Sequence, residues 1–224
     1  MTDLHPVTPA ASVPPGRLPV QIRMTVNFTV DSYVENARRN LVRGLPEIGP
    51  YQPIQKESLL ICGNGPSLAL SVTRLRKLAH KGHRVVACNK AYQFLKEHKV
   101  PVWAQAVMDA QPHCAEFVKH RDPITYLISS MTDPGVLDAL QGQPNVFLWH
   151  AYQGGGEAET LDEYFPARPM HYIAGGSTVT LRMLNLGYVL DFRDFQLYGV
   201  DSCLRGRRLY ATGEQGPDQA IIAK

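Results

Sequence analysis

The sequence lacks several features that would place the protein in a specialised class. No apolar run is long enough to cross a membrane as a helix, and the amino-terminal residues contain no apolar core of a signal peptide. The net charge is only +3 and no long basic run occurs, which argues against nucleic acid as a partner. We therefore expect a cytoplasmic protein that has no membrane span and does not bind nucleic acid.

Cysteine is scarce and scattered, which argues against a disulfide-bonded protein and against a zinc-binding protein. The cysteines show no Cys-x-x-Cys spacing, so we interpret them as reduced thiols of the core rather than as disulfides or zinc ligands. The four residues are Cys62, Cys88, Cys114 and Cys203.

The sequence does contain the composition of an ordinary globular core. Its 224 residues are 44% hydrophobic, which suits one α/β domain with an extension. Residues 58–62 form a short apolar run, typical of a buried strand, and Gly-Asn-Gly-Pro interrupts it at 63–66. Apolar residues at helical spacing follow from Ser67 onward. A strand, a glycine turn and a helix in this order begin a βαβ unit.

The glycine turn is the first candidate for ligand binding. A helix N-terminus leaves backbone N–H groups unpaired and carries a partial positive charge, and glycine lets a phosphate come close to that backbone. The turn matches neither Gly-x-Gly-x-x-Gly nor a Walker A loop, and a turn that only connects strand to helix explains the same residues. The candidate nucleotide-binding residues here are Gly63, Asn64, Gly65 and Ser67.

From residue 58 onward, strand and helix patterns alternate. This alternation predicts an α/β, Rossmann-like fold with a mostly parallel sheet and helices on both faces. The predicted strands cover 58–62, 83–88, 102–108, 124–129, 145–149, 170–173 and 194–199. The predicted helices cover 67–80, 89–98, 111–120, 133–140, 157–164 and 177–189.

The residues before this region are predicted to form an extension in two parts. Residues 1–20 are rich in proline and are interpreted as an extended arm, with docking on a protein partner as an alternative. Residues 21–57 are predicted to form a strand at 24–30 and a helix capped by Asp31 or Ser32, packed against the main sheet. Residues 58–224 then form the nucleotide-binding domain.

Polar residues that follow the predicted strands are further candidates, because ligands of such folds bind beyond the carboxyl ends of the strands. Asn89, Asp109 and Asp201 lie at such positions. For Asn89 and Asp109, capping of the next helix is the alternative. As functional residues, the two carboxylates would bind Mg²⁺ or a ribose hydroxyl, and on neighbouring strands they would share one ion.

Three other features have both a functional and a structural interpretation. Ser177 and Thr178 follow two glycines and open a helix, so their hydroxyls suit either phosphate binding or ordinary capping. His150 and His171 are candidate bases, although a single histidine near a strand end is more often structural. Residues 154–156 are all glycine and are interpreted as a mobile loop that covers the cleft.

Five short motifs occur in a fixed order along the chain, and with them the sequence resembles the MptE-like 6-hydroxymethylpterin diphosphokinase family. That Rossmann-like group also includes domains of motility-associated glycosyltransferases. The glycine turn, the Cys-Asn pair and the late Gly-Val-Asp are similar to those of bacterial lipooligosaccharide sialyltransferases that use a CMP-sugar. The motifs are residues 62–68 (Cys-Gly-Asn-Gly-Pro-Ser-Leu), 87–91 (Ala-Cys-Asn-Lys-Ala), 108–109 (Met-Asp), 175–179 (Gly-Gly-Ser-Thr-Val) and 197–201 (Leu-Tyr-Gly-Val-Asp).

The resemblance implies a transferase that moves diphosphate from ATP to a hydroxymethyl acceptor. It implies Mg²⁺ near Asp109 and Asp201, which would be the catalytic and metal-binding residues. The nucleotide would contact Gly63, Asn64, Gly65, Ser67, Asn89, Ser177 and Thr178.

Two other functions stay open on the sequence. One is a glycosyltransferase that uses a nucleotide sugar and a glycan acceptor, with a base such as His150 or His171. No histidine follows Asp201, where the sialyltransferases carry a catalytic one after their Gly-Ile-Asp element. The other is a non-catalytic structural or interaction module that retains the fold.

Overall fold

A computed structural model describes residues 29–49, 54–201 and 210–211, and seven parallel strands form its centre. The strands are β1 (Leu59–Cys62), β2 (Arg84–Cys88), β3 (Ala104–Val107), β4 (Thr125–Ser129), β5 (Val146–Ala151), β6 (Tyr172–Ile173) and β7 (Phe195–Tyr198). The helices are α1 (Val30–Leu41), α2 (Leu68–His80), α3 (Ala91–Glu97), the 3₁₀ helix η1 (Pro112–Val118), α4 (Pro134–Ala139), α5 (Glu157–Tyr164) and α6 (Val179–Val189). The predicted α/β Rossmann-like class is confirmed, and each element predicted from residue 58 onward has a counterpart.

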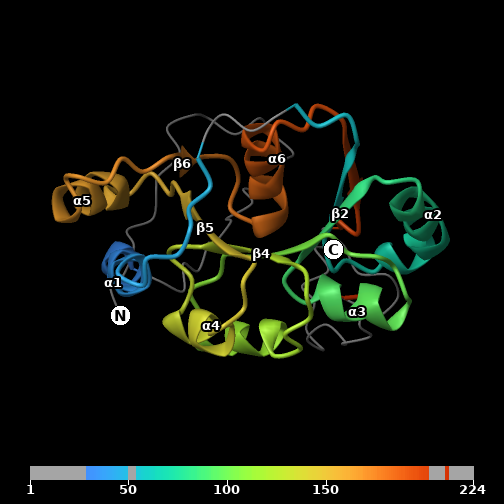
Figure 1. Cartoon of the computed structure of the whole chain (residues 1–224), viewed down its shortest axis with the longest axis horizontal. Coiled ribbons are helices and arrows are strands. Elements are labelled where there is room, and N and C mark those ends of the chain that lie inside the picture. Colours follow the sequence, from blue (N-terminus) through green and yellow to red (C-terminus); the bar gives the residue numbers. More distant parts are fainter. Residues whose placement is uncertain (1–28, 50–53, 202–209, 212–224) are drawn as a thin grey trace, which may run out of the picture.

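The strand order is β6-β5-β4-β3-β2-β1-β7. The chain therefore adds β1 to β6 in one direction and then returns across the whole sheet to place β7 beside β1. Parallel connections are right-handed, so the return helix α6 must lie on the opposite face from the helices of the forward connections. Figure 1 shows this arrangement, with α6 above the sheet and α3 and α4 below it.

The inner strands are buried at nearly every position because helices cover both faces of the sheet, whereas the edge strand β7 is only half-buried. In β1, Leu60 and Cys62 belong to the cluster that packs under α2 and α3. Leu59 and Ile61 belong to the larger cluster, which also contains Leu186 of α6. Side chains alternate between the two faces of a strand, so this run of four buried residues serves two cores.

The amino-terminal helix begins earlier than predicted. Thr29 is its N-cap, with an extended backbone and a hydroxyl that accepts a hydrogen bond from the Ser32 N–H. The predicted caps Asp31 and Ser32 lie inside the helix instead, and Val30 is helical rather than extended. A β-branched residue is tolerated here because no preceding helical turn crowds its side chain. The proline-rich arm 1–20 and positions 24–28 of the predicted strand lie outside the described residues.

The segment from α1 to residue 48 belongs to the same core as the sheet. Asn40 is fully buried and donates to the carbonyls of Ser130 and Thr132, after β4. Further along, the Ile48 N–H donates to the Leu148 carbonyl, which extends the sheet beside β5. The predicted packing against the main domain is thus present, and the predicted boundary between residues 57 and 58 stays a prediction.

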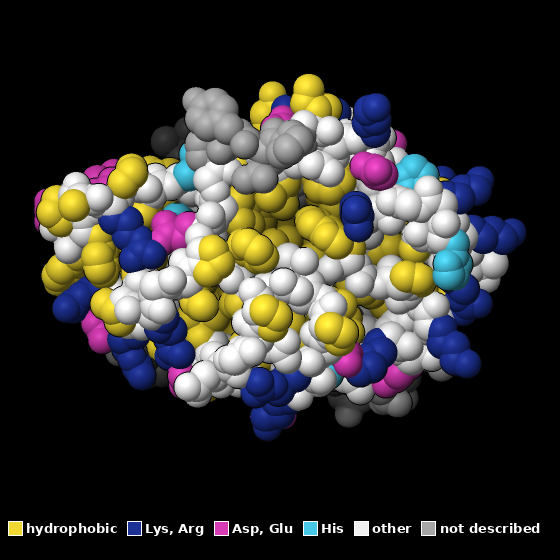
Figure 2. Space-filling view, viewed as in Figure 1, with side chains coloured by type: hydrophobic (Ala, Val, Ile, Leu, Met, Phe, Trp, Pro, Cys, Tyr) yellow, Lys and Arg dark blue, Asp and Glu magenta, His cyan; other side chains and the backbone are white. Residues whose placement is uncertain are grey.

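The surface of this domain carries both apolar and basic side chains. Figure 2 shows apolar side chains near the middle of the view and basic side chains at its edges, including those over α2. In the part of the chain that the structure describes, no helix has the length and apolarity needed to cross a membrane.

Candidate functional site

Four predicted segments follow neighbouring strands at the carboxyl edge of the sheet. Asp201 follows β7, and the glycine turn 63–67 follows its neighbour β1. Asn89 follows β2, the next strand in the sheet, and Asp109 follows β3. The structure therefore brings these candidate residues to one continuous edge, where ligands of doubly wound folds bind.

The amino end of α6 lies over the same edge. Thr180 Oγ1 is 3.4 Å from the position that a Cβ on Gly63 would occupy, and Thr180 also forms a hydrogen bond with the Cys88 thiol. Ser177 and Thr178 are both exposed at the start of this helix. The Thr178 hydroxyl accepts the Leu181 N–H at 3.3 Å, so Thr178 is an ordinary N-cap. Phosphate binding by Ser177 and Thr178 stays a prediction.

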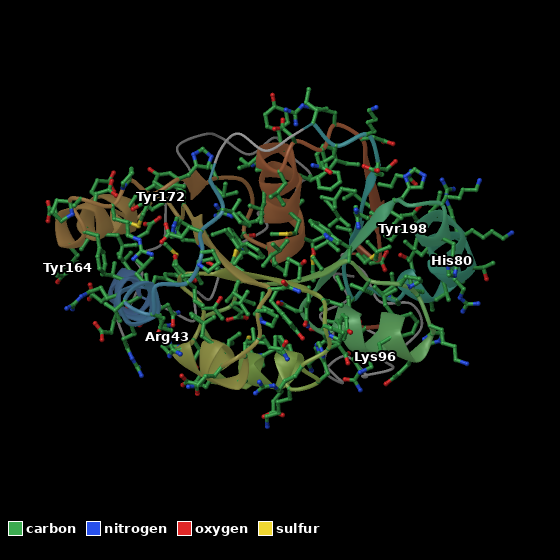
Figure 3. All side chains as sticks on the ribbon, in the orientation of Figure 1. Arg43, His80, Lys96, Tyr164, Tyr172 and Tyr198 are labelled. Carbon is green, nitrogen blue, oxygen red and sulfur yellow. The ribbon has the colours of Figure 1, made fainter. Side chains whose placement is uncertain are left out.

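The glycine turn after β1 is joined to the segment after β7 by main-chain hydrogen bonds. The Gly63 N–H donates to the Tyr198 carbonyl and the Gly65 N–H to the Gly199 carbonyl, each at 2.8 Å. The Ser67 N–H donates to Asp201 Oδ2 at 2.7 Å. These contacts lie at the β7 end of the sheet, which carries Tyr198, whereas Tyr172 marks the opposite end on β6 (Figure 3).

The turn needs glycine because backbone from β7 lies directly against it. A Cβ on Gly63 would lie 2.5 Å from the Gly199 carbonyl oxygen, and one on Gly65 would lie 2.7 Å from the same atom and against the Asp201 carboxylate. Gly199 itself has φ +60, a conformation that favours glycine. The two turn glycines therefore have a structural role whether or not a ligand binds.

Asp201 takes the place at the amino end of α2 that a phosphate would take. The α2 N-cap, Ser67, makes no side-chain capping bond, and the Asp201 carboxylate accepts its N–H instead. A carboxylate at a helix N-terminus is stabilised by the unpaired N–H groups and the helix dipole. Binding of a nucleotide phosphate at this turn stays a prediction, and it requires Asp201 to move away.

Asp109 and Asp201 do not follow neighbouring strands. Two strands, β1 and β2, lie between β3 and β7, and a strand spacing of about 4.8 Å puts three steps, about 14 Å, between them. The two carboxylates are therefore not placed on neighbouring strands to share one ion, and Mg²⁺ near Asp109 and Asp201 stays a prediction. His113 and Cys114 have ligand atoms within 4.8 Å of the Asp109 carboxylate.

Asn89 has a left-handed backbone conformation and a buried side-chain oxygen. Its φ is +50, in the left-handed region that asparagine tolerates better than most residues. Its N–H donates to the Ala106 carbonyl, and its own carbonyl accepts from Gln105 Nε2 at 3.0 Å. Its Oδ1 is buried and has no hydrogen-bond partner among the described residues. The predicted capping of α3 by this side chain is wrong, because the N-cap is Lys90 and no side-chain bond is made.

His150 and His171, the two candidate bases, are not at the open edge. His150 is fully buried, with Nδ1 3.0 Å from Ser130 Oγ and Nε2 3.0 Å from Glu47 Oε2. His171 precedes β6 and so lies at the amino end of that strand.

Glu47, the partner of His150, also pairs with Arg168. The His150 bond, and then Arg168, lower the pKa of Glu47 against the opposing effect of burial.

The glycine loop 154–156 is held by Glu157, a residue that the sequence did not single out. The buried Glu157 carboxylate accepts from the N–H groups of Gln153, Gly154 and Gly155. Burial alone would raise the pKa of Glu157, but these backbone donors together lower it. The predicted mobile loop is therefore tied to the first residue of α5.

Arg182 of α6, which is 3% exposed, joins this loop to the sheet. One of its terminal nitrogens donates to the Ile173 carbonyl at 2.6 Å and the other to Gln153 Oε1 at 3.1 Å. Tyr33 of α1 lies near the same groups: burial, and then the charges of Asp109 and Glu157, raise the pKa of its phenol. Polar groups of α1, α5 and α6 therefore lie near one another, and the charge of Asp109 acts on the Tyr33 phenol.

The family model of 6-hydroxymethylpterin diphosphokinase MptE-like proteins matches residues 31–207. The chain belongs to this family. No relative was found among curated proteins. Among solved structures, the chain is similar to the MAf glycosyltransferase from Magnetospirillum magneticum AMB-1, with a TM-score of 0.55 and 18% sequence identity.

That likeness covers 80% of this chain and 28% of the MAf glycosyltransferase chain. At this level of identity it shows a shared fold. Family membership supports a transferase.

We expect Gly65→Ala to lower the free energy of unfolding by about 1–3 kcal/mol, because the added Cβ overlaps the Gly199 carbonyl and the Asp201 carboxylate. Urea unfolding followed by circular dichroism measures the change. Gly49→Ala is the matched control, since its Cβ meets no atom within 4 Å. Equal stability of the two variants would contradict the packing described for the turn.

The lowered pKa of Glu47 predicts a pH-dependent stability. A carboxyl group whose pKa is lower in the folded state stabilises the fold above its unfolded pKa, and this contribution disappears as the pH falls through the folded value. Between about pH 6 and about pH 3.5, we expect wild type to lose more stability than Glu47→Gln. Urea midpoints at the two pH values measure this, with Glu163→Gln on the exposed side of α5 as control. Parallel losses in wild type and Glu47→Gln would refute it.

Proposed function

We propose that the protein is a nucleotide-dependent transferase that moves diphosphate from ATP to a hydroxymethyl acceptor. Family membership supports the reaction class. The observation that carries the proposal is Asn89, whose side-chain oxygen lies buried without a partner among the described residues, at the carboxyl end of β2. This end of the strand belongs to the edge where ligands of such folds bind.

The surroundings of Asn89 fix its backbone, but no described residue donates to its side-chain oxygen. Ala106 and Gln105, both on β3, hold the main-chain N–H and carbonyl. A buried acceptor without a donor costs about 1–3 kcal/mol, and a ligand hydroxyl or amino group would recover this energy. Asp109, after the neighbouring strand, supplies a carboxylate acceptor on the same side of the edge. Two acceptors on adjacent strands suit the hydroxyl groups of a ribose.

The phosphates of the nucleotide have two candidate positions. At the amino end of α2 they would compete with Asp201 for the Ser67 N–H. At the amino end of α6 they would meet the exposed Ser177 and Thr178. Both positions offer helix N-termini, which favour anions.

Glycosyl transfer from a nucleotide sugar is the second candidate. The observation in its favour is the separation of Asp109 and Asp201, which removes the paired carboxylates expected for a magnesium-dependent diphosphate transfer. The MAf protein, which shares the fold, is named a glycosyltransferase.

A thermal-shift screen tests the proposal with ATP, GTP, CMP, CDP, UDP and GDP, each with and without Mg²⁺. A ligand that binds only the folded state raises the Tm by mass action. We expect ATP to give the largest shift, and we expect Asn89→Ala to weaken nucleotide binding about tenfold, which corresponds to about 1.4 kcal/mol. Asn145→Ala is the control, because the exposed Asn145 precedes β5 and lies at the opposite edge.

Turnover is then measured with ATP and a hydroxymethylpterin as acceptor. Asp109→Asn should abolish it, and full activity of that variant would remove Asp109 from the reaction. A larger shift with CMP or a nucleoside diphosphate would favour glycosyl transfer. The absence of any shift would reject both enzymatic functions and leave a non-catalytic module.

A further inference from the structure

Three different metal-binding side chains meet where β3 leads into η1. The carboxylate of Asp109, the imidazole of His113 and the thiol of Cys114 each have a ligand atom within 4.8 Å of the other two. Cys114 Sγ and His113 Nε2 are 3.9 Å apart. No other such group of three occurs among the described residues.

The local structure orients each of these side chains. Asp109 Oδ1 accepts the Gln111 N–H at 3.1 Å, and the Cys114 N–H donates to the Gln111 carbonyl at 3.0 Å. The ring of His113 lies edge-on to Phe117, with centroids 5.5 Å apart. Gln111 thus fixes the segments that carry the carboxylate and the thiol, and Phe117 limits the rotation of the imidazole.

The accessibility of the cluster suits the entry of an ion from solvent. Cys114 is fully buried, Asp109 is partly buried and His113 is exposed. Burial, and then the charges of Asp109 and Asp133, raise the pKa of the Cys114 thiol to about 12. Of the three ligands, the imidazole is therefore the most accessible to solvent and the thiol the most buried.

The donor set selects the class of metal. One oxygen, one nitrogen and one sulfur ligand are characteristic of zinc and similar transition metals, whereas Mg²⁺ takes oxygen ligands. With Zn–S near 2.3 Å and Zn–N near 2.0 Å, a tetrahedral site places sulfur and nitrogen about 3.5 Å apart. The 3.9 Å between Cys114 and His113 is a few tenths of an ångström longer.

We propose that Asp109, His113 and Cys114 bind one zinc-class transition-metal ion. Three protein ligands leave a fourth tetrahedral position open for water or another small ligand, as in catalytic rather than structural zinc sites. The site goes beyond the proposed transferase function. It shares Asp109 with that function, but its other two ligands, His113 and Cys114, have no part in it, so it is tested without a nucleotide. It also replaces the expectations that Asp109 takes magnesium and that Cys114 is no metal ligand.

Titration of the full chain with Co²⁺, without nucleotide and without a polyhistidine tag, tests the site. Cobalt replaces zinc in such sites and reports its ligands in the absorption spectrum. We expect one equivalent of Co²⁺ to give a near-ultraviolet thiolate-to-cobalt charge-transfer band and visible bands of tetrahedral intensity. One equivalent of Zn²⁺ should remove these bands, whereas a large excess of Mg²⁺ should leave them.

The variants assign the ligands one at a time. Cys114→Ala should lose the charge-transfer band, and His113→Ala and Asp109→Asn should each weaken Co²⁺ binding at least tenfold. Because Cys114 is buried, its variant is checked by circular dichroism, and the exposed His113 provides a variant that leaves the core intact. Cys203→Ser and His80→Ala are the matched controls and should bind like wild type.

The proposal is overturned if wild type gives no charge-transfer band, if the band survives in Cys114→Ala and disappears in Cys203→Ser, or if Mg²⁺ competes as well as Zn²⁺. These results are independent of the thermal shifts with nucleotides. A protein that binds ATP without cobalt would refute only the metal site, and one that binds cobalt without any nucleotide would refute only the proposed function.

Discussion

The arrangement of the carboxyl edge depends on the close backbone contact between the turn after β1 and the segment after β7. Gly63 and Gly65 donate to carbonyls of that segment, and neither position has room for a side chain. The contact fixes where α2 begins and places Asp201 at its amino end. This backbone contact thus sets the β7 side of the candidate site, and Asn89 and Asp109 are the acceptors beyond β2 and β3.

Much of the fold could be predicted from the sequence, because the apolar runs and the helical spacing from residue 58 onward are local patterns. The neighbours of each strand could not be predicted in this way. The pairing of Leu59 with Phe195 depends on a return connection across the sheet, and no local pattern encodes it. For this reason the sequence does not predict that the Asp201 carboxylate accepts the Ser67 N–H at the start of α2. Thr29 was missed as a cap because the β-branched residues around it resemble a strand.

The candidate site could be predicted only in part. The strand ends gave Asn89 and Asp109, but their partners are set by packing. His150 is a candidate general base on the sequence because the sequence does not show its burial. In the structure its two ring nitrogens pair with Ser130 and Glu47. Glu157 and Arg182 gave no signal, since their roles depend on backbone groups of distant loops. Asp109, His113 and Cys114 are close together in the sequence, but the lack of Cys-x-x-Cys spacing favours a core thiol for Cys114.

The position of β7 beside β1 also affects the order in which the protein can fold as it is synthesised. The hydroxyl of Ser58, the residue before β1, donates a hydrogen bond to Asp194, which lies 136 residues later in the chain. At about 5–20 residues per second, a ribosome needs roughly 7–27 seconds to cover that distance. During this time one side of β1 lacks its neighbouring strand, while β2 is already available on the other. Unpaired strand edges promote aggregation, so the nascent chain passes through a vulnerable stage that the finished sheet no longer shows.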